Sequence, residues 1–173
     1  MYFKSISLDN FRNYNNLSLE FDSKLNIITG KNAQGKTNVL EAIYLCSTSR
    51  SHKASRDREM IRFGAEEAHI RTILEKSGRE YQIDLHLKRN QSRGIAIDRI
   101  PIRRASDLFG IVNTVFFSPE DLMLIKGAPT LRRKFLDREI SQANPTYYHN
   151  LCKFGKISTQ RNALLKDFRQ FGF

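Results

Sequence analysis

Eight consecutive residues near the N-terminus have the types and the spacing of a loop that binds phosphate groups. The run Gly30-Lys31-Asn32-Ala33-Gln34-Gly35-Lys36-Thr37 fits the pattern G-x-x-x-x-G-K-[ST] at every defined position. Its glycines allow successive backbone N–H groups to turn inward around a phosphate, because no side chain obstructs them. Lys36 would reach the β- and γ-phosphates of ATP, and the Thr37 hydroxyl would ligate Mg²⁺. The run therefore predicts a site for ATP and Mg²⁺.

Two elements must position this loop, a strand before it and a helix after it. The apolar run Leu25 to Thr29 predicts a short buried strand, and Asn38 to Ser47 predicts a helix. The predicted helix has an apolar face made of Val39, Ile43 and Cys46. A helix that begins near Lys36 points the positive end of its dipole at the bound anion. The order strand, loop, helix is the one that phosphate binding requires.

The rest of the first half is rich in strand patterns, with apolar and polar residues alternating. Alternating runs surround Ile6 and Leu8, Leu17 to Phe21, and Tyr81 to Lys88. The turn Lys76 to Arg79 predicts a hairpin that joins Ala68 to Glu75 with the last of these runs. A further buried strand is predicted at Val112 to Phe117. Together these patterns predict an α/β fold, with a mixed sheet flanked by an antiparallel sheet.

The second half changes to helical patterns after Ser118. Ser118 is expected to cap a helix that starts at Pro119, carries Glu120 and Asp121 in its first turn, and ends at Gly127. Thr130 is expected to cap a second helix that runs to about Gln142, where Asn144-Pro145 breaks it. The change predicts two domains, residues 1–118 as the N-terminal part of an ATP-binding head and residues 119–173 as the beginning of a helical lobe.

The last predicted helix, from Thr146 to the end, has an unusual apolar stripe. Heptad positions a and d hold Phe154, Ile157, Leu164, Phe168 and Phe171, with Arg161 at the remaining place. Such a stripe requires a partner helix, and Gly155 is expected to make this helix less regular. Because the chain stops while the stripe is still running, it has the pattern of a truncated sequence.

Composition limits the partners and the compartment. The 173 residues contain 29 Lys and Arg against 18 Asp and Glu, which gives a net charge of +11. The excess lies in three groups: Arg50, Lys53, Arg56, Arg58 and Arg62; Lys88, Arg89, Arg93, Arg99, Arg103 and Arg104; and nine residues between Arg132 and Arg169. Charge alone is equally consistent with nucleic-acid binding and with a solvated basic surface. Cys46 and Cys152 are expected to be buried free thiols, and no signal or membrane-spanning run is visible, so a soluble cytoplasmic protein is expected.

Several segments in fixed order resemble a known family. Asn10-Phe11-Arg12-Asn13-Tyr14 and the loop with its helix resemble the opening of the SMC-like ATPases. Pro119-Glu120-Asp121, Gly127-Ala128-Pro129, Arg132 to Asp137 and Gln160 to Lys166 resemble the RecF family of bacterial DNA replication and repair proteins. The resemblance covers the whole chain, although members of that family are about twice as long.

The resemblance implies an ABC-type ATPase head that forms an ATP-dependent homodimer and binds single-stranded DNA or a single/double-strand junction. It also implies roles in recombinational repair, replication and SOS induction, together with recombination mediator partners. Asn38 and Asn32 match positions beside the nucleotide, and Arg12 matches a basic residue that approaches it. Turn formation is the other interpretation of Asn32, and a surface arginine that of Arg12.

Three basic residues and several missing motifs leave alternatives open. Arg132, Arg133 and Lys134 are either DNA contacts or the exposed face of a helix whose buried face is Leu131, Phe135 and Leu136. The Ser-Gly signature and the acidic strand end that hydrolysis needs are not visible, because Glu120 and Asp121 are better explained by a helix start. Three functions remain: a DNA-dependent ATPase, a nucleotide-responsive DNA-binding module without hydrolysis, and a small P-loop kinase.

Overall fold

The computed structural model describes residues 1–51, 54 and 56–170, which form two compact units. The first is Met1–Thr114, and the second begins at Val115. The division after residue 118 into an ATP-binding head and a helical lobe stays a prediction. Lys53 and Phe171, which the sequence placed in a basic group and in the apolar stripe, lie outside the described residues.

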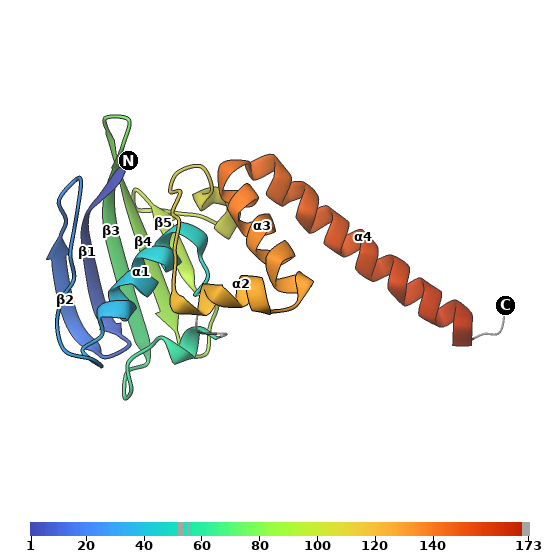
Figure 1. Ribbon diagram of the computed structural model, residues 1–173, viewed down its shortest axis with the longest axis horizontal. Helices are drawn as coiled ribbons and strands as arrows, with labels where there is room; N and C mark the ends of the chain where they lie inside the picture. Colours follow the sequence, from blue (N-terminus) through green and yellow to red (C-terminus); the bar gives the residue numbers. More distant parts are fainter. Residues whose placement is uncertain (52–53, 55, 171–173) are drawn as a thin grey trace. The chain divides into compact units, whose positions relative to one another are not determined.

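An antiparallel sheet of six strands makes up most of the first unit (Figure 1). The strands lie in the order β2-β1-β3-β4-β5-β6. Their bounds are Tyr2–Phe11 (β1), Tyr14–Glu20 (β2), Glu67–Lys76 (β3), Arg79–Lys88 (β4), Gly94–Ile97 (β5) and Ile100–Pro101 (β6). The predicted hairpin is confirmed, since Lys76 pairs with Arg79 across a turn in which Ser77 and Gly78 both have positive φ. Such a turn matches the right-handed twist of the two strands.

Helix α1, Lys36–Thr48, covers one face of this sheet (Figure 1). Apolar residues of the sheet and of the helix meet there without exposure to solvent, among them Ile6, Leu8, Ile70, Ile83, Leu85, Ala42 and Leu45. The opposite face is polar, with Arg71 Nε 2.6 Å from Asp84 Oδ1 and His86 Nε2 3.0 Å from Glu67 Oε2. The alternation read from the sequence therefore gives one dry and one wet face. This core fixes α1 against the sheet, and α1 directly follows the phosphate loop.

Two predicted strands are wrong. Residues 25–29 have no strand conformation, and the side chains of Leu25 and Ile27 are 73% and 76% exposed. Residues 112–117 are likewise irregular, and Val115 is 90% exposed. A short apolar run becomes a strand only where a neighbouring strand satisfies its backbone hydrogen bonds. Within the described residues, no strand pairs with either run.

Short 3₁₀ turns and helices complete the chain. In the first unit these are η1 (Asp57–Glu59) and η2 (Ala105–Leu108), and in the second they are η3 (Pro119–Leu122), α2 (Met123–Lys126), α3 (Pro129–Ala143) and α4 (Pro145–Gln170). The predicted helical start at Pro119 is confirmed, although it begins as the 3₁₀ turn η3. The Ser118 hydroxyl does not act as the predicted cap, because it donates to Asp121 Oδ2, which also accepts the backbone N–H of Ser118 at 2.7 Å. Thr130 is not a cap, since Pro129 already occupies the first turn of α3, where its missing N–H costs nothing.

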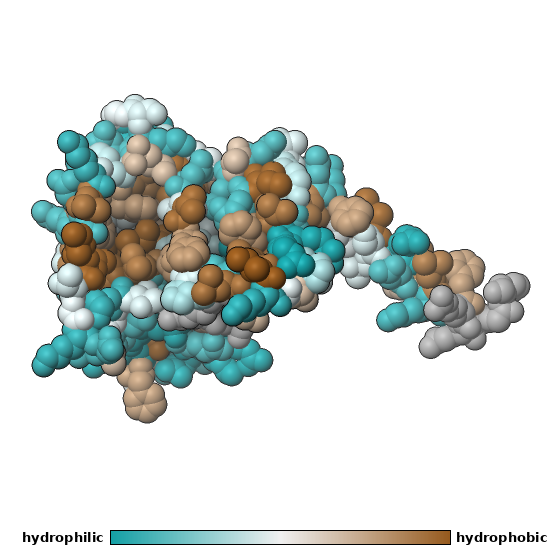
Figure 2. All heavy atoms as spheres, in the orientation of Figure 1, coloured by the Kyte–Doolittle hydropathy of each residue, from teal (hydrophilic) through white to brown (hydrophobic). Residues whose placement is uncertain are grey.

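The second unit exposes many apolar side chains, and the space-filling view coloured by hydropathy shows several of them on its surface (Figure 2). Helix α4 runs without a break through Gly155, contrary to the expected irregularity. The side chains of its stripe are 59–69% exposed at Phe154, Ile157, Leu164 and Phe168. Cys152 is exposed rather than buried, because it lies on this uncovered helix, whereas Cys46 is buried as expected. Leu131 and Leu136 are also exposed, so the predicted buried face of α3 is wrong for these two residues.

Candidate nucleotide-binding site

The loop before α1 has the sharp backbone turns that its glycines predicted. Gly30, Ala33 and Gly35 have φ values of 145°, 64° and 95°. Gly35 is the N-cap of α1. A β-carbon at Gly35 would lie 2.5 Å from Asn13 Oδ1 and 2.8 Å from the Tyr14 hydroxyl. Glycine is therefore required here twice, for its conformation and for the close approach of neighbouring side chains.

Lys36 turns back over its own loop. Its Nζ donates to the carbonyl oxygens of Gly30 and Lys31 at 2.7 and 2.6 Å. The N–H groups of Asn38 and Val39 donate to the carbonyl oxygen of Gly35 at 2.7 and 3.3 Å. Those of Lys36 and Thr37 come before the first helical hydrogen bond, so they can donate to an anion at this end. Thr37 is exposed beside them. The Lys36 ammonium, the N–H groups of Lys36 and Thr37 and the Thr37 hydroxyl thus lie at one helix N-terminus, which is the donor set that a phosphate chain with Mg²⁺ requires.

The turn between β1 and β2 braces the loop. Asn13 Nδ2 and the Tyr14 hydroxyl both donate to the carbonyl oxygen of Gln34, at 3.2 and 3.3 Å. Asn38 Nδ2 donates to Asn13 Oδ1 at 2.8 Å. Sequence reasoning assigned no role to Asn13 or Tyr14. Local sequence patterns could not predict these contacts, because Asn13 and Tyr14 lie more than fifteen residues before Gln34 in the chain. The sequence singled out the two residues only as part of the segment that resembles SMC-like ATPases.

Arg12 is engaged by a buried acid. Its Nε and Nη2 donate to the two carboxylate oxygens of Glu41 at 2.8 and 2.6 Å, and its Nη1 donates to the carbonyl oxygen of Glu59 at 2.7 Å. Glu41 is 0% exposed and also accepts from the Ser51 hydroxyl. The pair therefore ties α1 to the β1–β2 turn and to η1. The sequence analysis did not predict Glu41 as a site residue. It could have been identified as a charged residue in a predicted helix that is otherwise largely apolar.

The remaining candidate residues lie elsewhere. Asn32 is exposed in the loop. In the second unit, Arg132 Nη1 donates to the carbonyl oxygen of Leu124 at 2.9 Å and lies 3.3 Å from that of Gly127, so it covers the C-terminal end of α2. Arg133 and Lys134 are exposed on α3. The geometry thus gives Arg132 a structural role and leaves two basic side chains open to solvent.

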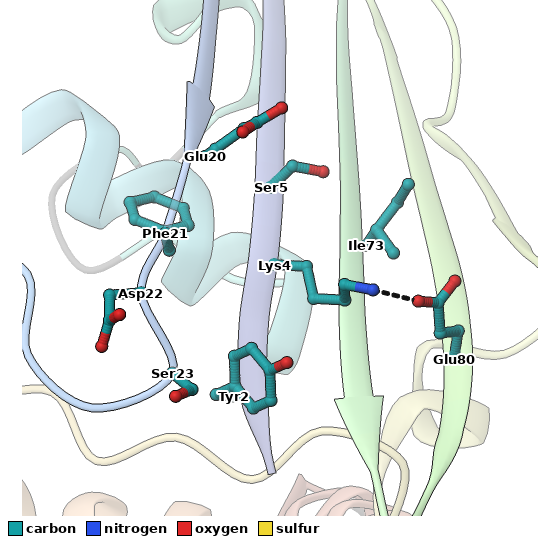
Figure 3. Close-up of a pocket in the computed structure, with 9 residues that line it drawn as sticks. All are labelled: Tyr2, Lys4, Ser5, Glu20, Phe21, Asp22, Ser23, Ile73 and Glu80. Carbon is teal, nitrogen blue, oxygen red and sulfur yellow. Dashed lines mark hydrogen bonds and ion pairs between the residues drawn. The ribbon is translucent and has the colours of Figure 1, made fainter.

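A separate hollow of about 500 Å³ lies on the first unit, next to β1 (Figure 3). Lys4 forms an ion pair with Glu80 there, and this contact raises the pKa of Lys4. The Tyr2 hydroxyl donates to Glu75 at 3.1 Å, which raises the pKa of Tyr2. Glu20 and Asp22 add further negative charge to the lining. Because carboxylates outnumber the one lysine, this hollow does not suit a phosphate group.

The described residues contain neither a metal-binding cluster nor a membrane-spanning helix. No group of three or more His, Cys, Asp and Glu residues has an arrangement that could hold a metal ion by itself. None of the described helices combines the length and the apolar character needed to cross a membrane.

A phosphate loop at the N-terminus of a helix that packs on an antiparallel sheet is typical of the fold of P-loop ATPase heads. Comparison with known families agrees: the AAA domain family matches residues 5–170, and the chain belongs to that family. It is 59% identical over 167 residues to the DNA replication and repair protein RecF of Agathobacter rectalis and 55% identical over 173 residues to that of Lachnoclostridium phytofermentans. These matches cover 96% and 100% of this chain. The resemblance to RecF is thus confirmed.

Solved structures give the same result. The recombination mediator protein RecF in its ATP form, from the RecFOR pathway, matches 99% of this chain with a TM-score of 0.91 and 38% identity. An SMC ATPase studied for ATP-driven dimerisation matches 80% of the chain with a TM-score of 0.66 and 19% identity, which supports the head fold alone. The predicted fold class is confirmed. The chain spans about half the length of its curated relatives, 46% and 47% of the two named above, and corresponds to their N-terminal portion.

Proposed function

We propose that this chain is the ATP-binding portion of a DNA replication and repair protein of the RecF type. The observation that carries the proposal is the loop itself, in which Lys36 and the Thr37 hydroxyl lie at the N-terminus of α1 and Gly35 leaves room for the bracing side chains of Asn13 and Tyr14. The high identity to RecF proteins along the whole chain supports it. The same identity favours this function over a small P-loop kinase.

ATP would be held by the backbone of residues 30–37, with Lys36 neutralising the β- and γ-phosphates. Thr37 would contribute its hydroxyl to Mg²⁺, which would supply positive charge beside the phosphates when bound. Asn32 lies within the loop, and Asn38 lies in the first turn of α1, where its Nδ2 donates to Asn13 Oδ1. Arg12 acts through Glu41 as a positioning residue, since its donors are already taken by that carboxylate and by the carbonyl of Glu59.

Further properties are proposed for the whole protein because its relatives are DNA replication and repair proteins. DNA binding, ATP-dependent homodimerisation, recombination mediator partners, SOS induction and a cytoplasmic location are proposed for the protein to which this portion belongs. The net charge of +11 supports binding to a polyanion. Asp121 is engaged at a helix start rather than at a strand end, which favours ATP-dependent DNA binding without hydrolysis for these residues by themselves.

The test is calorimetric titration of Mg-ATP into the chain and into Lys36→Ala. The variant loses the charge-assisted contacts of one ammonium, so its affinity is expected to fall by about tenfold to a hundredfold. Lys31→Ala is the matched control, because it removes a lysine from the same loop whose ammonium the motif does not require. Equal affinity of Lys36→Ala and the parent chain would contradict the proposal.

A further inference from the structure

A small basic pocket lies at the C-terminal end of α1, the end opposite to the phosphate loop. It has a volume of about 380 Å³, an apolar floor of Ile95 and Ile102, and a polar rim of Ser49, Arg50, Arg93 and Arg103. Ser49 is the C-cap of α1. A helix of 13 residues is about 20 Å long, so one phosphate group cannot occupy both ends. The pocket is thus separate from the nucleotide-binding loop.

Arg93 has a structural role in the pocket, because its guanidinium is already paired with other groups of the chain. Its Nε donates to Asp57 Oδ2 at 2.9 Å, its Nη2 also donates to Asp57, and its Nη1 donates to the carbonyl oxygen of Ser49 at 2.5 Å. Asp57 neutralises this guanidinium, and the contact with Ser49 covers the negative end of the α1 dipole. The two features that would repel an anion here, a carboxylate and a helix C-terminus, are therefore both paired with Arg93.

Arg50 and Arg103 supply two charges that nothing in the described part of the chain compensates. Both side chains are exposed at the pocket rim, and neither guanidinium has a hydrogen bond or ion pair with a described residue. Their backbones are fixed nonetheless. The N–H of Arg50 donates to Thr48 Oγ1 at 3.2 Å, and Ile102, next to Arg103, donates its N–H to the carbonyl oxygen of Ile95 at 2.9 Å. An anion in the pocket would therefore lie within reach of two exposed guanidinium groups of the same sign of charge.

We infer that this pocket binds a backbone phosphate of nucleic acid, with Arg50 and Arg103 as the contacting residues and the Ser49 hydroxyl as a further donor. Guanidinium groups bind phosphate oxygens in pairs of parallel hydrogen bonds, which suits two arginines on one open rim. The choice of DNA over a free anion rests on the proposed function, since the chain is strongly basic and its relatives are DNA repair proteins. Arg50 and Arg103 would then be specific residues through which the chain contacts DNA.

The test compares duplex DNA binding by the chain, by Arg50→Gln/Arg103→Gln and by the control Lys24→Gln/Arg79→Gln, using fluorescence anisotropy at several salt concentrations. The control removes the same charge from exposed positions outside the pocket. The pocket variant is expected to bind DNA at least about tenfold more weakly than the control at low salt. The slope of log K against log salt should fall in magnitude by about 0.9, since one phosphate contact is lost and each contributes about 0.9.

Three further measurements fix the meaning of each outcome. Arg50→Lys/Arg103→Lys keeps the charge but loses the paired geometry, so an intermediate affinity is expected. Calorimetry with ATP should give parental affinity for the pocket variant, and an unchanged thermal midpoint would show that it folds.

If the parent chain binds DNA and the pocket variant matches the control, the inference is wrong while the proposed function stands. A further outcome would also overturn the inference: the pocket variant loses binding of inorganic phosphate but keeps its DNA affinity. The pocket would then be a site for a free anion. Failure of the parent chain to bind DNA would overturn the inference, whereas the proposed function is tested separately by the titration with Mg-ATP.

Discussion

Replacement of Glu41 by Gln tests how strongly the ion pair under the phosphate loop stabilises the first unit. The carboxylate is 0% exposed and accepts hydrogen bonds from Arg12 Nε at 2.8 Å, from Arg12 Nη2 at 2.6 Å and from Ser51. Glutamine keeps the shape but turns one acceptor into a donor that faces a donor of Arg12. Breaking a buried ion pair by removing one partner costs about 3–5 kcal/mol.

Solvent lowers that cost in this case. The side chain of Arg12 is 21% exposed, so water relieves part of the loss, and we expect the free energy of unfolding to fall by about 2–3 kcal/mol. At about 2–4 °C per kcal/mol for a chain of this size, the thermal midpoint should fall by about 4–12 °C. The measurement is urea denaturation together with a thermal scan. Glu66→Gln is the matched control, because Glu66 is 81% exposed, lies 3.9 Å from Arg89 and should change stability by less than about 0.5 kcal/mol.

A double-mutant cycle measures the interaction energy between Arg12 and Glu41. Arg12→Gln should also destabilise the chain, and the combined variant should be less destabilised than the sum of the two single changes, since it leaves no unpaired buried charge. Additive losses, or a loss for Glu41→Gln no larger than that of the control, would refute the reasoning that Glu41 acts through Arg12.

Three shorter predictions concern the loop, the stripe and the thiols. Gly35→Ala should weaken ATP binding at least about tenfold by calorimetry, because the left-handed conformation alone costs an L-residue about 1–2 kcal/mol; parental affinity would contradict this. Leu164→Glu/Phe168→Glu should raise the monomer fraction in analytical ultracentrifugation, since both side chains are 59% exposed, and should leave ATP affinity unchanged. Burial raises the pKa of Cys46, so a thiol reagent at pH 8 should modify exposed Cys152 and spare Cys46. Because the unfolded thiol ionises above about pH 8.5 and the folded one does not, Cys46 should make the chain less stable as pH rises beyond that value.

Local patterns determined much of this protein. The alternation around Ile6 and Leu8 and the apolar face of residues 38–47 correctly gave the strands, the helix and the core, because burial on one face imposes a fixed period on the sequence. The spacing from Gly30 to Thr37 gave the phosphate loop for a similar reason. Its chemistry depends on neighbours in the chain, so the sequence already contains it.

Only the tertiary structure decided which distant residues meet. Asn13 and Tyr14 brace Gln34, and Arg12 pairs with Glu41, through contacts that no local period encodes. Arg50 and Arg103 belong to separate basic groups in the sequence and share a pocket only because β6 ends near the C-terminal end of α1. The apolar runs 25–29 and 112–117 show the converse: a strand requires a hydrogen-bonded neighbour, and local sequence cannot state whether the folded chain provides one.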